Sequence, residues 1–106
     1  MIEIGVPVKL LNNSSWTIIY VAGGAFAVGM VHVTNISMVV AKVRLCLVQP
    51  AGVPSINNAL FWDLSIQANS ILELLAGDVW SPGYTLQGLT NVNFALNVKV
   101  GGALMI

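Results

Sequence analysis

The chain has 106 residues, enough for a single domain over residues 1–106, because two separate cores would each be too small to offset chain entropy. Hydrophobic residues make up 57% of it and charged residues only 8%, against about 25% charged in ordinary globular domains. Four basic residues balance four acidic ones, which excludes a basic nucleic-acid-binding surface and predicts apolar surface that another protein covers.

The opening segment, residues 1–11, is apolar. Glu3 stands where a signal peptide carries basic residues, so we expect no signal peptide and synthesis in the cytoplasm. Two interpretations of the segment remain open: an edge strand of the fold, or an N-terminal arm that pairs with the sheet edge of a neighbour. On the arm interpretation, Ile2, Ile4 and Val6 are candidate interface residues.

Residues 10–41 contain no Asp, Glu, Lys or Arg, and such a stretch is long enough to span a bilayer. A Gly-Gly break, clusters of β-branched residues and His32 argue against a membrane helix, and no basic cluster flanks the stretch to orient it. We therefore expect strands here, and no membrane partner.

Apolar and polar residues alternate along the whole chain with a period of two, interrupted by turn residues. In the segment 25–35 the alternation breaks, because Phe26 and Val28 are out of phase with Val31 and Val33; a bulge near Gly29 would restore one apolar face. The predicted strands, in chain order, are residues 6–11, 15–21, 25–35, 41–48, 60–65, 71–75, 84–88 and 93–100.

The pattern is clearest in the segments 41–48 and 93–100. Val43, Leu45 and Leu47 would face one way in the first, and Phe94, Leu96, Val98 and Val100 would share a face in the second. About eight short strands without intervening helices predict an all-β antiparallel sandwich, either jelly-roll-like or immunoglobulin-like.

The order of several short segments is distinctive. They are Tyr-Val-Ala-Gly at 20–23, Val-His-Val-Thr-Asn at 31–35, Val-Arg-Leu-Cys-Leu-Val at 43–48, Asn-Ala-Leu-Phe-Trp-Asp-Leu at 58–64, Ser-Pro-Gly-Tyr-Thr-Leu at 81–86 and Val-Lys-Val-Gly-Gly at 98–102. Over residues 15–102 this order resembles the small β-sandwich virion proteins of tailed bacteriophages. The resemblance implies a capsid decoration or cement protein, or a tail or baseplate component, with no catalytic motif.

We expect no catalytic, metal or cofactor site. His32 and Cys46 are the only residues of their types, so they cannot supply a zinc site or an internal disulfide, and no third group marks them as a base and nucleophile. The acids Asp63, Glu73 and Asp78 would suit glycoside hydrolysis only if the fold brought two of them together.

Aromatic side chains are the candidate interface anchors, because their rings give large contact area at low entropic cost. Trp62, Trp80 and Tyr84 are the candidates, with core packing as the alternative for each. Trp16 and Tyr20 are predicted to lie in the core.

The scarcity of charge favours assembly over enzymatic activity. We therefore expect a virion protein on the capsid surface that binds the major capsid protein, and a homo-oligomer, with a trimer ahead of a dimer. The alternative is a tail, baseplate or receptor-binding component, including a carbohydrate-binding one that uses Trp62, Asp63, Trp80 and Tyr84.

Overall fold

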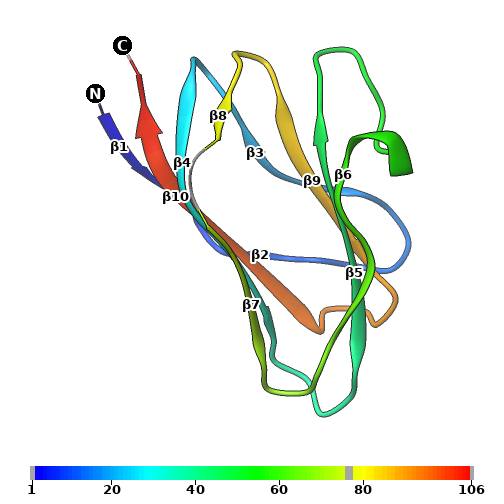
Figure 1. The fold of residues 1–106 in the computed structure, drawn as a ribbon. Helices are drawn as coiled ribbons and strands as arrows, with labels where there is room; N and C mark the ends of the chain where they lie inside the picture. The colour runs from blue at the N-terminus through cyan, green and yellow to red at the C-terminus, as the bar shows by residue number, and fades with distance from the viewer. Residues whose placement is uncertain (1, 76–77, 106) are drawn as a thin grey trace.

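The computed structural model describes residues 2–75 and 78–105, within which the chain forms ten strands and one short 3-10 helix (Figure 1). Two sheets pack face to face over one core. The first sheet contains β1 (Ile2–Gly5), β2 (Lys9–Leu10), β4 (Phe26–Asn35), β7 (Ile71–Leu75), β8 (Val79–Trp80) and β10 (Leu96–Leu104). The second contains β3 (Thr17–Val21), β5 (Ala41–Val48), β6 (Ala59–Ile66) and β9 (Thr85–Thr90), and the helix η1 (Ile56–Asn58) precedes β6.

The predicted antiparallel sandwich is confirmed, and the strand pairing has the winding of a jelly roll. Both β1 and β2 pair with β10, so together they form one interrupted strand. In the same way β7 and β8 both pair with β4 and form another. Counted this way, ten described strands become eight, which pair first with eighth, second with seventh, third with sixth and fourth with fifth. This nested pairing is a jelly roll, not the immunoglobulin order.

The N-terminal segment lies at the edge of the first sheet. The break between β1 and β2 contains Pro7, which has no N–H to donate to a ladder. The neighbouring N–H of Val6 still donates to the carbonyl of Val100 at 3.0 Å. Residues 2–10 therefore follow β10 of their own chain along nearly its whole length.

The core forms between the inner faces of the two sheets. In the first sheet Val31 and Val33 of β4 lie opposite Val100 and Val98 of β10, and all four are fully buried. Burial of each such side chain stabilises the fold by about 1.5–3 kcal/mol relative to exposure. The second sheet contributes Val43, Leu45 and Leu86, with Leu47 packed against them, as the alternation in 41–48 predicts.

The bulge predicted near Gly29 is confirmed. Met30 pairs with Gly101 and Val28 pairs with Gly102, so Gly29 has no partner in the register. The extra residue shifts the alternation of inward and outward side chains by one position. The apolar residues of β4 on both sides of the bulge therefore point into the core.

The last strand begins later than predicted. Phe94 lies in the turn before β10 with a φ of 59°, and it is 57% exposed instead of sharing the inner face of Leu96. The N–H of Phe94 donates to the carbonyl of Leu11, and that of Ala95 to Val92, so the backbone is held in a turn. The prediction that Phe94 shares the inner face of Leu96 is therefore wrong, because its backbone belongs to the turn and not to the strand.

Candidate functional site

One end of the sandwich exposes a run of large hydrophobic side chains. The loop between β4 and β5 exposes Ile36, Met38, Val39 and Val40, and Met38 is 87% exposed. The N–H of Ile36 donates to the carbonyl of Ala95 at 2.8 Å, so this loop abuts the turn that carries Phe94. Both lie at the lower end of the molecule in Figure 1. We call the exposed side chains Ile36, Met38, Val39, Val40 and Phe94 the apolar end.

A buried amide holds the apolar end in place. The Nδ2 of Asn35 donates to the carbonyl of Val39 at 2.8 Å and to that of Ile66 at 2.9 Å. Its Oδ1 accepts from the N–H of Ser37 at 2.9 Å and from the Ser37 hydroxyl at 2.7 Å. Asn35 is fully buried and both its oxygen and nitrogen are satisfied, so the loop has a fixed conformation although its side chains are exposed.

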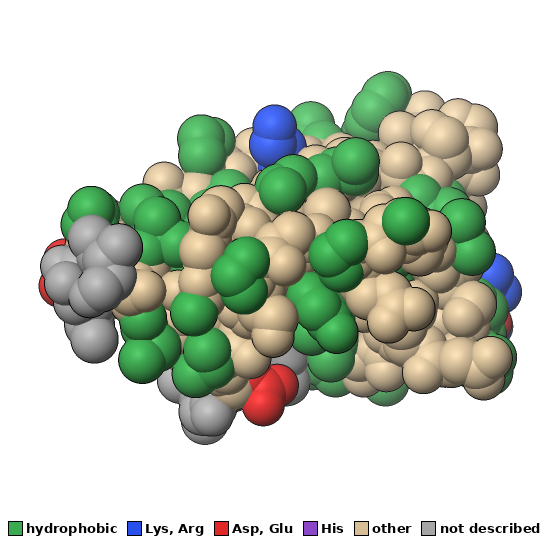
Figure 2. Space-filling model, turned by 90° about the horizontal axis from the view of Figure 1, so that it is seen from above, with side chains coloured by type: hydrophobic (Ala, Val, Ile, Leu, Met, Phe, Trp, Pro, Cys, Tyr) green, Lys and Arg blue, Asp and Glu red, His purple; other side chains and the backbone are tan. Residues whose placement is uncertain are grey.

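The opposite end of the sandwich carries the termini and the loop between β5 and β6 (Figures 1 and 2). Large hydrophobic side chains are exposed there as well, among them Ile56 of this loop and Ile2 and Met105 beside the termini, and a few charged side chains show near the margin of Figure 2. Val53 of this loop is 73% exposed.

The aromatic interface candidates have different surroundings. Trp80 is only 2% exposed and packs on Phe26 with 5.6 Å between ring centroids, so it is a core residue and not a surface anchor. Tyr84 is half-buried and lines a hollow of about 550 Å³ beside the 49–58 loop. Trp62 is half-buried on the second sheet, where its surroundings include a charged pair.

The three N-terminal candidates also differ from one another. Ile2 is half exposed at the edge of the first sheet, whereas Val6 is buried in the core. Ile4 is partly buried and packs against the core cluster. Of the three, Ile2 is thus the most exposed side chain.

A bulge in β6 builds a cluster of charged and aromatic side chains. Val43 pairs with Leu64 and Leu45 with Phe61, so Trp62 and Asp63 together lie opposite the single residue Arg44. Asp63 has a φ of 57°, a left-handed conformation that Asp tolerates better than most residues. This local backbone places both side chains beside the same guanidinium.

Arg44 makes two kinds of contact in this cluster. Its Nε and Nη2 donate to the two carboxylate oxygens of Asp63 at 2.6 and 3.1 Å, and its Cζ lies 4.1 Å from the ring centroid of Trp62. The hydrogen bonds from Arg44 lower the pKa of Asp63, and the nearby charge of Lys42 adds to this effect. The hydrogen bonds to Asp63 raise the pKa of Arg44.

Trp16 belongs to this cluster and not to the core. Its ring centroid lies 6.2 Å from that of Trp62, and the side chain is half-buried outside the core cluster. The prediction that Trp16 is a core residue is therefore wrong, because its position just before β3 is outside the alternating part of that strand. Tyr20 packs against the core and on Phe26, as predicted.

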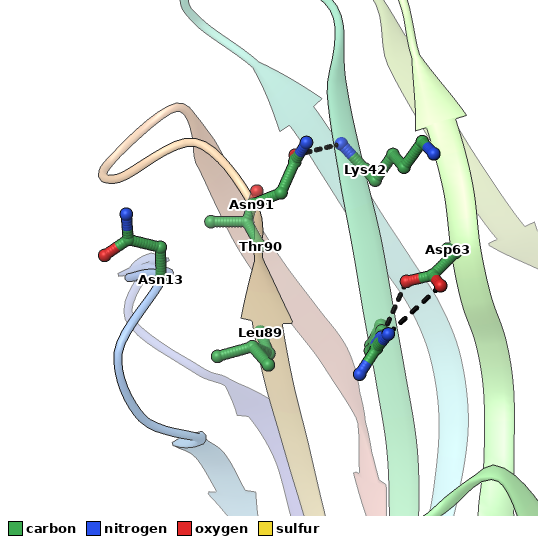
Figure 3. A pocket seen from close by; sticks show the side chains of 7 residues that line it. Asn13, Lys42, Asp63, Leu89, Thr90 and Asn91 are labelled. Atoms are coloured by element: carbon green, nitrogen blue, oxygen red, sulfur yellow. Dashed lines mark hydrogen bonds and ion pairs between the residues drawn. The ribbon is translucent and has the colours of Figure 1, made fainter.

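A polar hollow of about 240 Å³ lies beside the cluster (Figure 3). It is formed by β5, β6, β9 and the adjoining loops, and Leu89 is its apolar component. The Oδ1 of Asn91 accepts from the backbone N–H of Lys42 at 2.7 Å, which ties two of its walls together. The complete lining is Asn13, Lys42, Arg44, Asp63, Leu89, Thr90 and Asn91.

The residues considered for catalysis are not brought together. His32 lies between two inward-facing valines, so it points outward from the first sheet, where its Nε2 is 3.6 Å from Glu73. Cys46 is on the second sheet, buried, and its thiol donates to the carbonyl of Ser55 at 3.3 Å. Burial raises the pKa of that thiol, which disfavours the nucleophilic thiolate.

The acids are separated in the same way. Glu73 faces out beside His32 on the first sheet, and Asp63 is paired with Arg44 on the second. Asp78 is exposed near the start of β8. Residues 2–75 and 78–105 contain no group of three or more His, Cys, Asp or Glu side chains that could hold a metal ion.

No protein-family model, curated protein or solved structure matches this chain. Over the part of the chain that the structure describes, no helix combines the length and hydropathy needed to cross a membrane. Function is therefore inferred from the apolar end and from the polar hollow.

Proposed function

We propose that this protein is a structural component of a bacteriophage virion, a capsid decoration or cement protein that binds the outer shell and stabilises it. The observation that carries the proposal is the apolar end, where five large hydrophobic side chains are exposed together on a loop and turn. Hydrophobic surface of this kind, on a chain with few charges, is typical of a protein that has a partner.

The rigidity of the apolar end supports binding to a preformed surface. The hydrogen bonds of Asn35 fix the loop before any partner arrives, so docking does not have to order it. Apolar area removed from water contributes about 25 cal/mol per Å² before the costs of association are subtracted. Met38, the most exposed of the five side chains, is the expected centre of the contact.

Two further features favour a virion protein. The order of segments over residues 15–102 resembles that of tailed-phage virion proteins. The jelly roll is also an architecture that viral capsid proteins use, although a fold alone is only an analogy for function.

Stabilisation of the shell follows from binding linkage. A protein that binds the assembled lattice and not its dissociated subunits shifts the equilibrium toward assembly by its binding free energy. Many copies bind to one shell, so their individually small stabilising contributions add up. No chemical step is required of the decoration protein.

The test compares capsid shells with and without the protein. Bound protein should raise the temperature at which the shells break open, and the double variant Met38→Ser/Phe94→Ser should bind at least about tenfold more weakly. Val53→Ser, at the opposite end of β5, is the matched control and should bind normally. Shells that are equally robust without the protein would contradict the cement role.

The second candidate is a tail, baseplate or receptor-binding component. The exposed polar hollow beside Trp62 favours a receptor-binding role over a purely structural one. Cryo-electron microscopy of the virion distinguishes the two, because density for the sandwich would lie on the capsid in one case and on the tail in the other.

A further inference from the structure

A second hollow, of about 550 Å³, lies at the end of the sandwich opposite the apolar end. The loop between β5 and β6 forms one wall, and the turn before β9 forms the other; both segments lie at the upper end of the molecule in Figure 1. We call it the loop hollow, and its lining includes Leu47, Gln49, Val53, Asn57, Asn58 and Tyr84. No charged side chain and no histidine lines it among the residues that the structure describes.

Internal hydrogen bonds hold the loop wall in one conformation. The N–H of Gly52 donates to the carbonyl of Gln49 at 2.9 Å and closes a tight turn. Asn58 fixes the rest of the loop, because its Oδ1 accepts from the N–H of Ser55 at 3.0 Å and its Nδ2 donates to the carbonyl of Val53 at 2.9 Å. The loop hollow therefore has its shape before a ligand binds.

The turn that carries Tyr84 is held against the loop. The N–H of Tyr84 donates to the carbonyl of Ser81 at 3.2 Å, and its carbonyl accepts from the N–H of Ala22 at 2.9 Å. Gly83, with a φ of 84°, packs so closely on Pro50 that a Cβ at this position would lie 2.9 Å from the proline Cγ. The two walls therefore contact each other, and binding does not have to bring them together.

Polar groups in the loop hollow are left for a ligand. Over residues 2–75 and 78–105, the side-chain amides of Gln49 and Asn57 and the hydroxyl of Tyr84 make no hydrogen bond. Each amide has an acceptor oxygen and two N–H donors, which suits hydroxyl groups because a hydroxyl both donates and accepts. A wholly apolar ligand would leave these groups unpaired, and an ionic ligand would find no opposite charge among the described lining residues.

We propose that the loop hollow binds a neutral carbohydrate, with a sugar ring against Tyr84 and the sugar hydroxyls on the amides of Gln49 and Asn57. Sugar rings expose C–H groups on their faces and hydroxyls at their edges, which suits a site that combines an aromatic ring with amides. Leu47 and Val53 supply further apolar contact. The volume of about 550 Å³ lies within the range of roughly 300–1,000 Å³ for small-molecule sites and accommodates a monosaccharide or a disaccharide.

Sugar binding in the loop hollow does not rest on the cement role, which requires no small ligand. It gives the carbohydrate-binding alternative a different site, because Tyr84 lines the loop hollow whereas Trp62 and Trp80 do not. Shell binding is assigned to the opposite end of the sandwich. The double variant Met38→Ser/Phe94→Ser should therefore keep sugar binding, and a failure to bind sugars would leave the shell contact unaffected.

The experiment is a titration of the isotope-labelled full chain, followed by nuclear magnetic resonance. Glucose, galactose, mannose and N-acetylglucosamine are the neutral probes, glucuronate tests the effect of charge, and glycerol supplies hydroxyls without a ring. At least one neutral sugar should shift the amide signals of Gln49, Asn57 and Tyr84, with a Kd on the order of 1–10 mM. Glycerol should bind at least about fivefold more weakly, because it has no ring face to pack on Tyr84. Glucuronate should bind no more tightly than glucose, because no cation lines the loop hollow among the described residues.

Variants of the lining residues locate the site. Tyr84→Ala should weaken sugar binding at least about fivefold, whereas Tyr84→Phe, which keeps the ring, should bind within about threefold of the unmodified chain. Gln49→Ala and Asn57→Ala should each weaken binding about threefold. Both positions are exposed, so these variants test the site even if Tyr84→Ala does not fold. Asn13→Ala changes an exposed asparagine outside the loop hollow and should bind normally.

Several results would overturn the proposal. One is the absence of shifts with all four neutral sugars, and another is binding of glycerol as tight as that of the sugars. Tighter binding of glucuronate than of glucose would show that charge and not ring chemistry is recognised. Undiminished sugar binding by both Gln49→Ala and Asn57→Ala would place the bound sugar outside the loop hollow.

Discussion

At the scale of single residues, Asn35 is the most consequential polar side chain. Asn35→Ala removes four hydrogen bonds, among them the side-chain donor to the carbonyl of Ile66, while the carbonyl of Val39 keeps the Ser37 hydroxyl as a donor. We expect the variant to lose about 3 kcal/mol of unfolding free energy, measured by urea denaturation. Asn97→Ala is the matched control on the neighbouring strand, where the asparagine side chain makes no hydrogen bond within the described residues; it should lose less than about 1 kcal/mol. Equal losses in both variants would contradict this role of Asn35.

The Asp63 carboxylate gives the fold a specific dependence on pH. Its pKa is lower in the folded protein than in the unfolded chain, because Arg44 donates hydrogen bonds to the charged form. The resulting stabilisation is complete above the ordinary Asp pKa of about 3.9 and is lost as the pH falls through the lower folded value. Asp63→Asn keeps a residue type that tolerates the left-handed backbone and removes the charge.

Urea denaturation of both proteins across pH measures the effect. The midpoint of the unmodified chain should exceed that of Asp63→Asn by a constant amount from about pH 7 to about pH 5, and the two should converge below about pH 3.9. Glu3→Gln controls for the loss of one negative charge at an exposed position. A midpoint difference that persists unchanged in acid would contradict the role of the ion pair.

At the scale of elements, the bulge between β4 and β10 requires glycine at one position. A Cβ at Gly102 would overlap the carbonyl oxygen of Ala27 and lie 2.7 Å from the Cζ of Phe26. Gly102→Ala should therefore destabilise the fold by at least about 3 kcal/mol and lower the Tm by more than about 10 °C. Gly5→Ala, where nothing lies within 4 Å of the added Cβ, should show no loss. Calorimetry of both variants tests the difference, and similar Tm values would contradict it.

The elements themselves could largely be predicted from the sequence. Alternation marks most strands because one face of each sheet is buried, and the phase break around Gly29 marks its bulge for the same reason. The bulge at Trp62 and Asp63 has no such signal. Its outer-face residues are exposed or half-buried, so the core imposes no pattern on them, and the convergence with Arg44 depends on the strand register.

The loops and aromatic residues were harder to predict for related reasons. Hydrophobicity alone does not distinguish Trp80 in the core from Trp62 at the surface, because both lie in short apolar segments. Phe94 is large, apolar and exposed, although alternation places it on an inner face, and Met38 lies between predicted strands, where alternation predicts neither burial nor exposure. The apolar end is visible only when turns distant in sequence are seen at the same end of the sandwich.

At the scale of the whole molecule, the two outward surfaces differ in chemistry. The apolar end contains no charged residue, whereas the polar hollow contains three. The other basic side chains are dispersed, with Lys9 on β2 and Lys99 on β10. Docking on a shell through the apolar end therefore has little electrostatic contribution.

Salt dependence tests whether the shell contact is apolar. The Debye length shrinks from about 10 Å at 0.1 M salt to about 3 Å at 1 M, so an attraction between exposed charges is strongly screened over this range. The Kd for capsid shells, measured by co-sedimentation, should change less than about threefold over the same range, because the contact is apolar and backbone-mediated. A tenfold loss of shell binding at high salt would indicate charge-driven docking and contradict the assignment of the shell contact to the apolar end.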